Sequence, residues 1–185
     1  MRLTGGEHCG RRIKVPAEGT RPTQDKVRGA IFSSLAAHIP DARVLDLFAG
    51  TGAMGLEAWS RGAARVEWVE RDRTALRVLH DNVKTLQVPP ASGRVVGADV
   101  FTFLQFPPAG GGYDLVFADP PYAEAKSEGW LAKLAGQLTE QNWVKPGGVF
   151  AYETEGRDLP PELDGWRLAR NKNYGSTRVF LWVKE

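Results

Sequence analysis

The residues of this chain best suited to chemistry are consecutive: Asp119, Pro120, Pro121 and Tyr122 follow the apolar run 113–118. Neither proline carries a backbone N–H, and each ring fixes its own φ. A residue before a proline is held in an extended conformation, so Asp119 and Pro120 are both restricted. The result is a stiff platform with a carboxylate at one end and an aromatic ring at the other. It is suited to gripping a planar amino group and its ring, whereas the simpler interpretation is an ordinary turn after a strand.

A glycine-rich segment lies upstream of this platform, between a predicted strand at 43–48 and a predicted helix at 52–60. The glycines that fit the pattern G-x-G-x-x-G are Gly50, Gly52 and Gly55. Such glycines let the backbone turn tightly and approach a ligand, and the helix N-terminus offers free N–H groups. Glu70 comes 20 residues after Gly50, where a carboxylate can accept hydrogen bonds from a ribose diol. The alternative is that the glycines only allow tight packing of helix on sheet.

Two classes of cofactor use a site of this kind, the dinucleotides and S-adenosylmethionine. Asp46 lies within the strand just before the glycines. It would repel a pyrophosphate, but it can hold a loop or, directly or through water, an ammonium group. This favours S-adenosylmethionine. Asp99 follows the third predicted strand and supplies a carboxylate for an adenine amino group, or an N-cap for the next helix, and the two roles can coexist.

With a methyl donor in the neighbouring site, the platform would hold the amine that accepts the methyl group. Methylating an exocyclic aromatic amine is difficult because the nitrogen lone pair is delocalised into the ring. Hydrogen bonds accepted from that amine by the Asp119 side chain and the Pro120 carbonyl would localise the lone pair, and Tyr122 can stack on a base taken out of its helix. Orientation and proximity would supply most of the catalysis. Asp119 need not be a strong base, since the proton can leave after the methyl arrives.

The elements that position these residues alternate between strand and helix. Predicted strands lie at 43–48, 65–69, 94–97, 113–118, 147–152, 166–169 and 177–183. Predicted helices lie at 52–60, 72–86, 100–106 and 127–138, after an N-terminal hairpin at 2–16 and a helix from an N-cap at Thr23 to about residue 38. The alternation predicts a parallel sheet covered on both faces, with one antiparallel strand from the final hairpin.

Composition narrows the class of protein. A chain of 185 residues predicts one domain with a sizeable core. Residues 1–28 contain seven basic and three acidic residues, a local charge of +4 against +2 for the chain. This indicates a polyanionic partner or a merely solvated surface. Cys9 is the only cysteine and the three histidines are scattered, which predicts no disulfide and no metal site. We find no apolar run of membrane length and no signal peptide, so we expect a cytoplasmic protein.

The two motifs together resemble a known family. Asp119–Tyr122 following the 46–52 segment Asp-Leu-Phe-Ala-Gly-Thr-Gly is the signature pair of class I amino-methyltransferases. Three further stretches resemble the RsmD family: Gly5-Gly6 with Gly10-Arg11-Arg12-Ile13 and Pro16, Arg21-Pro22-Thr23 with Asp25-Lys26-Val27-Arg28, and Lys172-Asn173-Tyr174-Gly175 with Arg178. The resemblance spans the whole chain. Only the segment 86–93 and the loop 107–112 match no motif.

The resemblance implies a fold and an activity. The fold is α/β, a class I S-adenosylmethionine-dependent methyltransferase: a Rossmann-like, mostly parallel seven-stranded sheet with an antiparallel last strand, plus a short N-terminal β-hairpin and helix. Residues 1–40 would form a probable RNA-binding extension and 41–185 the methyltransferase domain. The implied activity is methylation of N2 of one guanine in bacterial 16S ribosomal RNA. The implied partner is that RNA, within the small ribosomal subunit or an assembly intermediate, and a monomer is expected.

The resemblance also implies roles for individual residues. The cofactor would be held by Asp46, Phe48, Ala49, Gly50, Thr51, Gly52, Gly55, Glu70, Arg71, Asp99 and Val100, and the guanine by Asp119, Pro120, Pro121 and Tyr122. RNA would be bound by Arg11, Arg12, Arg21, Thr23, Lys26, Arg28, Lys172 and Tyr174. Two points stay open. Arg21, Thr23 and Arg28 either contact RNA or close over the cofactor pocket, and Tyr174 is either a second stacking surface or part of the packing of the hairpin.

Other classes of protein explain less of the sequence. An oxidoreductase accounts for the glycine loop but not for Asp119–Tyr122. A DNA adenine-N6 methyltransferase shares the tetrapeptide, but it would need a target-recognition domain to read bases in the major groove, for which we expect no room. A glutamine-N5 protein methyltransferase usually has Asn in place of Asp119. A non-catalytic RNA-binding module explains the basic segment and leaves the cofactor loop without a role. Whether bare RNA or an assembled subunit is the substrate stays open at this point.

Overall fold

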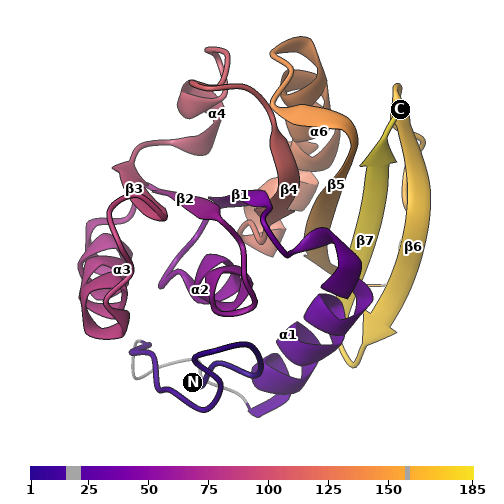
Figure 1. Ribbon diagram of the computed structural model, residues 1–185. Coiled ribbons are helices and arrows are strands. Elements are labelled where there is room, and N and C mark those ends of the chain that lie inside the picture. Colours follow the sequence, from indigo (N-terminus) through magenta and orange to yellow (C-terminus); the bar gives the residue numbers. More distant parts are fainter. Residues whose placement is uncertain (16–21, 157–158) are drawn as a thin grey trace.

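The protein is built around one seven-stranded sheet (Figure 1). The computed structural model describes residues 1–15, 22–156 and 159–185, with the backbone alone for residues 22–24. The strands are β1 (Arg43–Leu47), β2 (Arg65–Glu70), β3 (Gly93–Gly97), β4 (Tyr113–Ala118), β5 (Val144–Glu155), β6 (Trp166–Tyr174) and β7 (Thr177–Lys184). Their order is β3-β2-β1-β4-β5-β7-β6, and only the two pairings of β7 are antiparallel. The predicted fold class is confirmed.

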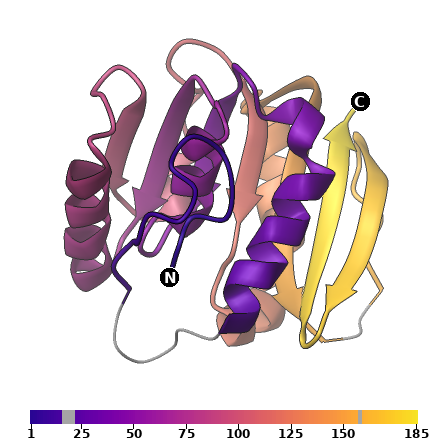
Figure 2. The ribbon, with the colours of Figure 1, turned by 60° about the horizontal axis from the view of Figure 1, so that its bottom comes forward.

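Helices cover both faces of this sheet. They are α1 (Pro22–Ser34), α2 (Ala53–Ser60), α3 (Arg73–Leu86), α4 (Val100–Phe103), α5 (Tyr122–Ser127) and α6 (Trp130–Glu140), with a short 3₁₀ turn η1 (Ala36–His38). Helices α1, α2 and α3 lie on one face, and α4 and α6 lie on the other (Figures 1 and 2). Burial on both faces is the usual state of a parallel sheet.

Several boundaries differ from the prediction. The helix predicted at 127–138 is α6, which begins only at Trp130 because Gly129 before it adopts a left-handed φ of +63°; the short helix α5 that precedes Gly129 was not predicted. Helix α1 begins at Pro22, so Thr23 lies inside it and is not its N-cap. The predicted hairpin at 2–16 is reduced to a single antiparallel bridge between Arg2 and Arg12. Strand β6 runs to Tyr174, five residues beyond the predicted end.

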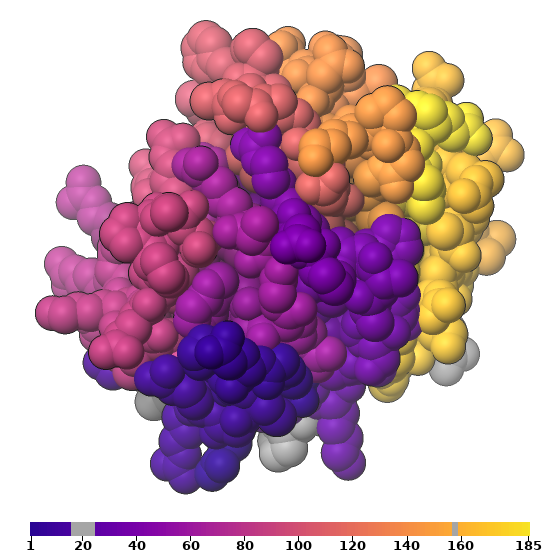
Figure 3. Space-filling model, in the orientation of Figure 1, coloured from indigo at the N-terminus to yellow at the C-terminus, as the bar shows by residue number. Residues whose placement is uncertain are grey.

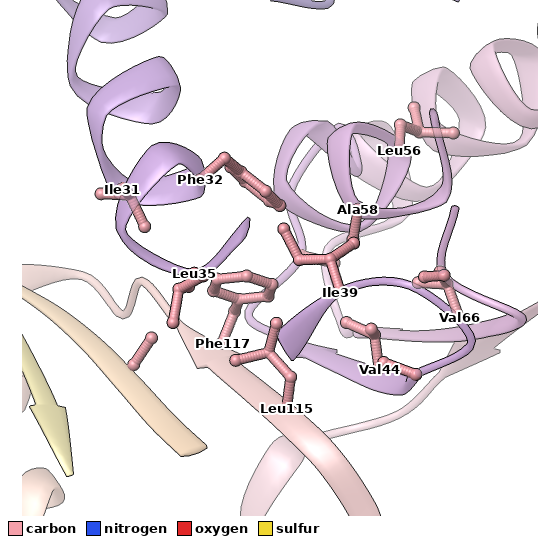
Figure 4. Packing of buried hydrophobic residues seen from close by; sticks show 14 of the residues in the cluster. Ile31, Phe32, Leu35, Ile39, Val44, Leu56, Ala58, Val66, Leu115 and Phe117 are labelled. Atoms are coloured by element: carbon pink, nitrogen blue, oxygen red, sulfur yellow. The ribbon is translucent and has the colours of Figure 1, made fainter. Parts of the chain in front are cut away.

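The core has one hydrophobic cluster on each face of the sheet. Figure 4 shows the cluster under α1, where Ile31, Phe32 and Leu35 point toward the sheet. The rings of Phe32 and Phe117 lie 5.3 Å apart. Alternation along β4 sends Leu115 and Phe117 to this face, and Val116 and Ala118 to the other. Burying one such side chain stabilises the fold by roughly 1.5–3 kcal/mol.

The first 15 residues pack against α2 and lie beside α1 (Figures 1 and 3). Leu3 is buried in the cluster under α1, together with Ile13 from the end of this segment. Glu57 of α2 holds the segment in place: its carboxylate accepts hydrogen bonds from the Thr4 backbone N–H at 2.9 Å and from the Thr4 hydroxyl at 2.7 Å. The N-terminal segment and the sheet domain therefore share packing and polar contacts.

Candidate active site

The platform and the glycine loop meet at the carboxyl ends of the parallel strands, in the middle of the sheet. Strands β1 and β4 are neighbours, and the chain leaves β1 toward β2 on the other side, so the strand order reverses between them. Crevices that bind ligands form at such points, outside the carboxyl ends of parallel strands. A cavity of about 540 Å³ lies there, within the range usual for small-molecule sites. It is lined by Phe48, Glu70, Arg71, Asp72, Val100, Asp119, Pro120, Pro121 and Tyr122.

The three glycines of the loop have different reasons to be glycine. Gly50 has a φ of +54°, and a Cβ placed on it would meet no atom within 4 Å. A Cβ on Gly52 would lie 2.2 Å from Leu79 Cδ1, and one on Gly55 would lie 2.2 Å from Trp68 Nε1. Gly52 and Gly55 thus allow tight packing onto the sheet. Only Gly50 leaves open space that a ligand can use.

Glu70 ties the glycine loop to the end of β2. Its Oε2 accepts the Gly50 N–H at 2.7 Å, and its Oε1 accepts the backbone N–H groups of Arg71 and Asp72, both at 2.8 Å. A carboxylate has about four acceptor sites. One site is therefore left for a hydroxyl group that enters the cavity.

Asp46 supports the loop from below and does not line the cavity. Its Oδ2 accepts the Gly55 N–H at 2.8 Å, which fixes the start of α2. The pKa of Asp46 is raised to about 8: burial raises it most, the Gly55 hydrogen bond opposes this, and the nearby charge of Glu70 adds to the rise. The structure thus places this carboxylate as a support of the loop, the first of the two roles predicted for it. The predicted cofactor residues Ala49, Gly50, Thr51, Gly52 and Gly55 are likewise not among the residues that line the cavity.

An aromatic wall stands beside Val100. Phe48 adopts a φ of +56°, which is uncommon for a residue with a side chain. Its ring stacks on Trp130 at 5.4 Å, and Phe101 meets Trp130 edge-on at 5.1 Å. Neither Trp130 nor Phe101 was predicted, because the contact joins β1 to α4 and α6, and no local sequence pattern links these elements. Backbone strain of this kind is typical of functional sites.

Arg71 lines the same cavity, and Asp99, which does not line it, lies against Arg71. Asp99 caps α4 by accepting the Thr102 N–H at 3.0 Å, which is the N-cap alternative predicted for it. Arg71 makes long ion pairs with Asp99 at 3.4 Å and with Glu124 of α5 at 3.6 Å. Arg71 therefore connects the ends of β2 and β3 to the helix that follows the platform.

The platform itself ends β4 and starts α5. Asp119 lines the cavity and is exposed to it. The pKa of its carboxyl is raised well above its usual range by desolvation, then by the negative charges of Glu153 and Asp46. The Tyr122 hydroxyl donates a hydrogen bond to Glu153 Oε1 at 3.1 Å. Burial, with the charges of Asp119 and Glu153, raises the pKa of Tyr122 as well. The ring is thus held at a fixed place beside the carboxylate.

Glu153 is the residue of this site that sequence reasoning missed. Ala118 and Tyr152 are opposite each other in the parallel pair β4–β5. Asp119 and Glu153 therefore follow on neighbouring strands, at the edge where the cavity lies. The available signal was an acidic residue directly after the apolar run 149–152, in a strand predicted to belong to the same sheet.

The residues predicted to bind RNA do not all have the same access to solvent. Arg11 is exposed, although its Nη2 donates to the Thr85 carbonyl at 2.8 Å. Arg12 and Lys26 are exposed, and within the described part of the chain neither makes an ion pair. Lys172 is exposed on β6, whereas Tyr174 is partly buried against the core, as its packing alternative predicted.

Arg28 contradicts its predicted place along RNA phosphates. The residue is 3% exposed, and its Nε lies 3.1 Å from Glu57 Oε2. Its Nη2 also pairs with Asp25 at 3.0 Å. A guanidinium turned toward a fully buried carboxylate is part of the scaffold. Arg21 lies outside the described residues, as does the side chain of Thr23.

The described ranges 1–15, 22–156 and 159–185 contain neither a candidate metal site nor a membrane-spanning helix. No group of three or more His, Cys, Asp or Glu residues there could hold a metal ion. No helix within these ranges is long and apolar enough to cross a membrane.

Known proteins resemble the whole chain. The family described as Conserved hypothetical protein 95 matches residues 1–183. The ribosomal RNA small subunit methyltransferase D of Escherichia coli K12 is 36% identical over 100% of this chain and 90% of its own length. The protein of the same name from Haemophilus influenzae is 35% identical over 98% and 93%. The solved structure described as putative methyltransferase yhhF from Escherichia coli matches with a TM-score of 0.88 at 36% identity, covering 100% of this chain and 98% of that one. The chain belongs to this family, the RsmD family.

Proposed function

We propose that the protein transfers a methyl group from S-adenosylmethionine to the exocyclic N2 of a guanine in 16S ribosomal RNA. The observation that carries this proposal is one cavity with two kinds of wall. Glu70 and Val100 line one side, and the rigid platform Asp119–Tyr122 lines the other. The names of the full-length relatives support a small-subunit ribosomal RNA as the substrate. A ribosomal substrate places the proposed reaction in the cytoplasm, and we propose that the protein acts as a monomer.

The residues around the cavity fit S-adenosylmethionine. Gly50 leaves open space in front of the loop, where the methionine part would lie. Glu70 keeps one free acceptor site for the ribose. Phe48 and Val100 offer apolar surface to the adenine ring, whose amino group Asp99 would hold. The bound cofactor supplies a methyl group on a positively charged sulfur atom.

The platform would position the acceptor nitrogen. The Asp119 carboxylate and the Pro120 carbonyl accept hydrogen bonds from the amino group, which localises its lone pair. Tyr122 stacks on the base, and stacking of a base on an aromatic ring contributes about 1–3 kcal/mol. Since its hydroxyl is held by Glu153, the ring does not have to be ordered when the base arrives.

Asp119 would also take up the proton that the reaction releases. The methylated nitrogen must lose one proton to become a neutral amine. The raised pKa of Asp119 makes its carboxylate a better proton acceptor at neutral pH than an ordinary aspartate. The proton would move to an Asp119 oxygen and leave to solvent through the cavity.

The RNA would lie over exposed basic residues of the N-terminal part and of β6. We propose that residues 1–40 form an RNA-binding extension, with Arg11, Arg12, Lys26 and Lys172 facing phosphates. Arg21 and Thr23 stay in this proposal on the sequence alone. Phosphate contacts of this kind position the nucleic acid without reading its sequence.

The test uses labelled S-adenosylmethionine with undermethylated small subunits and, separately, with bare 16S ribosomal RNA. We expect label in one guanine, recovered as N2-methylguanosine, and more label in the particle that presents the base correctly. Label in adenine or in protein, or no label in either substrate, contradicts the proposed function. Comparing the two substrates also decides whether the assembled subunit or the free RNA is used.

A further inference from the structure

Glu153 forms an acidic pair with Asp119 that the proposed mechanism leaves half explained. The two carboxylates follow the opposed residues Ala118 and Tyr152 on neighbouring parallel strands. Both also border a narrow space between α1 and the sheet. Its other walls are mainly apolar: Ile31, Met54, Phe117, Ala118, Ala151 and Val179. In the proposed mechanism Glu153 only accepts a hydrogen bond from the Tyr122 hydroxyl.

The hydrogen-bonding capacity of this pair is not satisfied within the protein. Glu153 Oε1 receives the Tyr122 hydroxyl, while Oε2 receives no hydrogen bond from any described residue. In the described part of the chain, no Lys, Arg or His forms an ion pair with Asp119 or Glu153. Desolvation raises the pKa of both carboxyls. Asp119 is exposed and Glu153 is half-buried, so hydrogen-bond donors that arrive from outside can reach this unmatched pair.

Guanine brings two such donors on one edge. Its ring N1–H and its exocyclic N2–H₂ are adjacent and point in nearly the same direction. Adenine differs here, because its ring N1 beside the amino group is an acceptor with no hydrogen. Two neighbouring carboxylates therefore match guanine, and one of them would face a lone pair if adenine entered.

We propose that Glu153 Oε2 accepts the N1–H of the target guanine while Asp119 binds N2, so that Glu153 selects guanine over adenine. This inference rests on the proposed function. The platform alone does not discriminate, because a carboxylate and a stacked ring can hold either amino group. An adenine would leave the Glu153 carboxylate desolvated and unpaired, which is the most effective way for a site to reject an analogue.

Small subunits in which the target guanosine is replaced by 2-aminopurine riboside test this inference. This base keeps the N2 amine but has no N1–H. The wild-type protein should prefer guanine strongly. In Glu153→Gln, whose amide can either accept from N1–H or donate to a bare N1, the ratio of kcat/KM for guanine to that for 2-aminopurine should fall roughly 5- to 150-fold. The missing O6 affects both proteins equally, so the change in the ratio reports on N1.

Two further variants make the result decisive. Glu153→Ala removes the contact, and it should lower guanine use and shrink the ratio without improving 2-aminopurine. Glu155→Gln is the matched control, because Glu155 lies two residues along β5 on the same face and is exposed. Its ratio should equal that of the wild type. Cofactor affinity and melting temperature, measured for each variant, show that the site is intact.

The outcomes separate this inference from the proposed function. If wild-type protein does not methylate the guanine subunits, the proposed function fails. If it does, and Glu153→Gln and Glu153→Ala keep the wild-type ratio, Glu153 does not read N1 and only this inference is overturned. If the ratio of kcat/KM for guanine to that for 2-aminopurine falls in both Glu153 variants and does not fall in Glu155→Gln, the inference is supported.

Discussion

Two groups of carboxylates in this protein have opposite surroundings. Glu57 of α2 is fully buried, and its oxygens receive hydrogen bonds from Thr4, Arg28 and Arg61. These donors lower its pKa although burial alone would raise it. Asp119 and Glu153, by contrast, have no cationic partner among the described residues, and their pKa values are raised.

The difference separates scaffold from site. A buried charge that the protein itself neutralises is fixed in the folded state, and removing its partner is costly. A carboxylate that borders a cavity and that the protein leaves unmatched is available to a ligand. Glu57 holds the N-terminal segment, α1 and α2 together. The pair at the end of β4 and β5 is available for a substrate.

Replacing Asp119 tests the site side of the comparison and should give the largest effect. In Asp119→Asn, the methyl-transfer rate should fall about 10²- to 10⁴-fold, because the proton acceptor and the charged hydrogen bond to the amine are both lost. Cofactor affinity should stay nearly unchanged by calorimetry. The melting temperature should not fall, since an unpaired charge has been removed. A variant that melts as early as a Glu57 variant would break the comparison.

Replacing Glu57 tests the scaffold side. In Glu57→Gln, Arg28 is left as a buried, partly unpaired cation, which should lower the free energy of unfolding by about 3–5 kcal/mol. For a chain of this size that corresponds to roughly 6–20 °C in melting temperature. The rate per folded molecule should stay near that of the wild type. Exposed Glu140 at the end of α6 is the control; Glu140→Gln should shift stability by less than about 0.5 kcal/mol.

Asp46 is buried like Glu57, yet its pKa is raised like those of Asp119 and Glu153. Its contribution to stability should therefore depend on pH. Its pKa is about 8 in the folded protein against a usual value of 3.8. Between these values the folded state holds a proton that the unfolded state has lost, so this group makes the protein less stable as pH rises. The matched Glu57 behaves oppositely: its lowered pKa gives stability that is present above about pH 4.5 and lost as pH falls.

The corresponding experiment compares Asp46→Asn with the wild type in melting scans from pH 4 to pH 8. The amide can still accept the Gly55 N–H, and it does not ionise. The variant should gain stability relative to the wild type as pH rises, on the order of 5 kcal/mol between pH 4 and pH 8. A constant difference across this range would mean that Asp46 keeps an ordinary pKa in the folded state.

The sequence predicted the parts of this fold and site that depend on local patterns. The apolar run before Asp119 predicted the end of one strand, and the glycines after Asp46 predicted the end of another. Together they predicted the two parts of the site. The sequence could not divide the glycine motif by role, because the packing at Gly52 and Gly55 depends on Trp68 and Leu79, which lie on β2 and α3. It also missed the break at Gly129, where only the backbone conformation separates α5 from α6.

Contacts across distant strands and helices explain the other errors. Glu153 was overlooked because its relation to Asp119 comes from the register of β5 on β4. Arg28 was assigned to an RNA surface because the basic N-terminal segment was counted as charge alone. Nothing in that segment shows that Glu57, 29 residues further on, would bind its guanidinium.

The smallest effect is expected for an exposed arginine, which we compare with a buried one. Arg12 is exposed and makes no ion pair with any described residue, whereas Arg28 is buried against Glu57. In Arg12→Ala, the slope of log affinity for RNA against log salt should become shallower by about 0.7–0.9, the value of one phosphate contact, with no change in melting temperature. Arg28→Ala should instead destabilise the fold. Arg65→Ala, at the exposed start of β2 and the far edge of the sheet from the cavity, is the control. Equal slopes for Arg12→Ala and Arg65→Ala would remove Arg12 from the RNA surface and leave the scaffold role of Arg28 untouched.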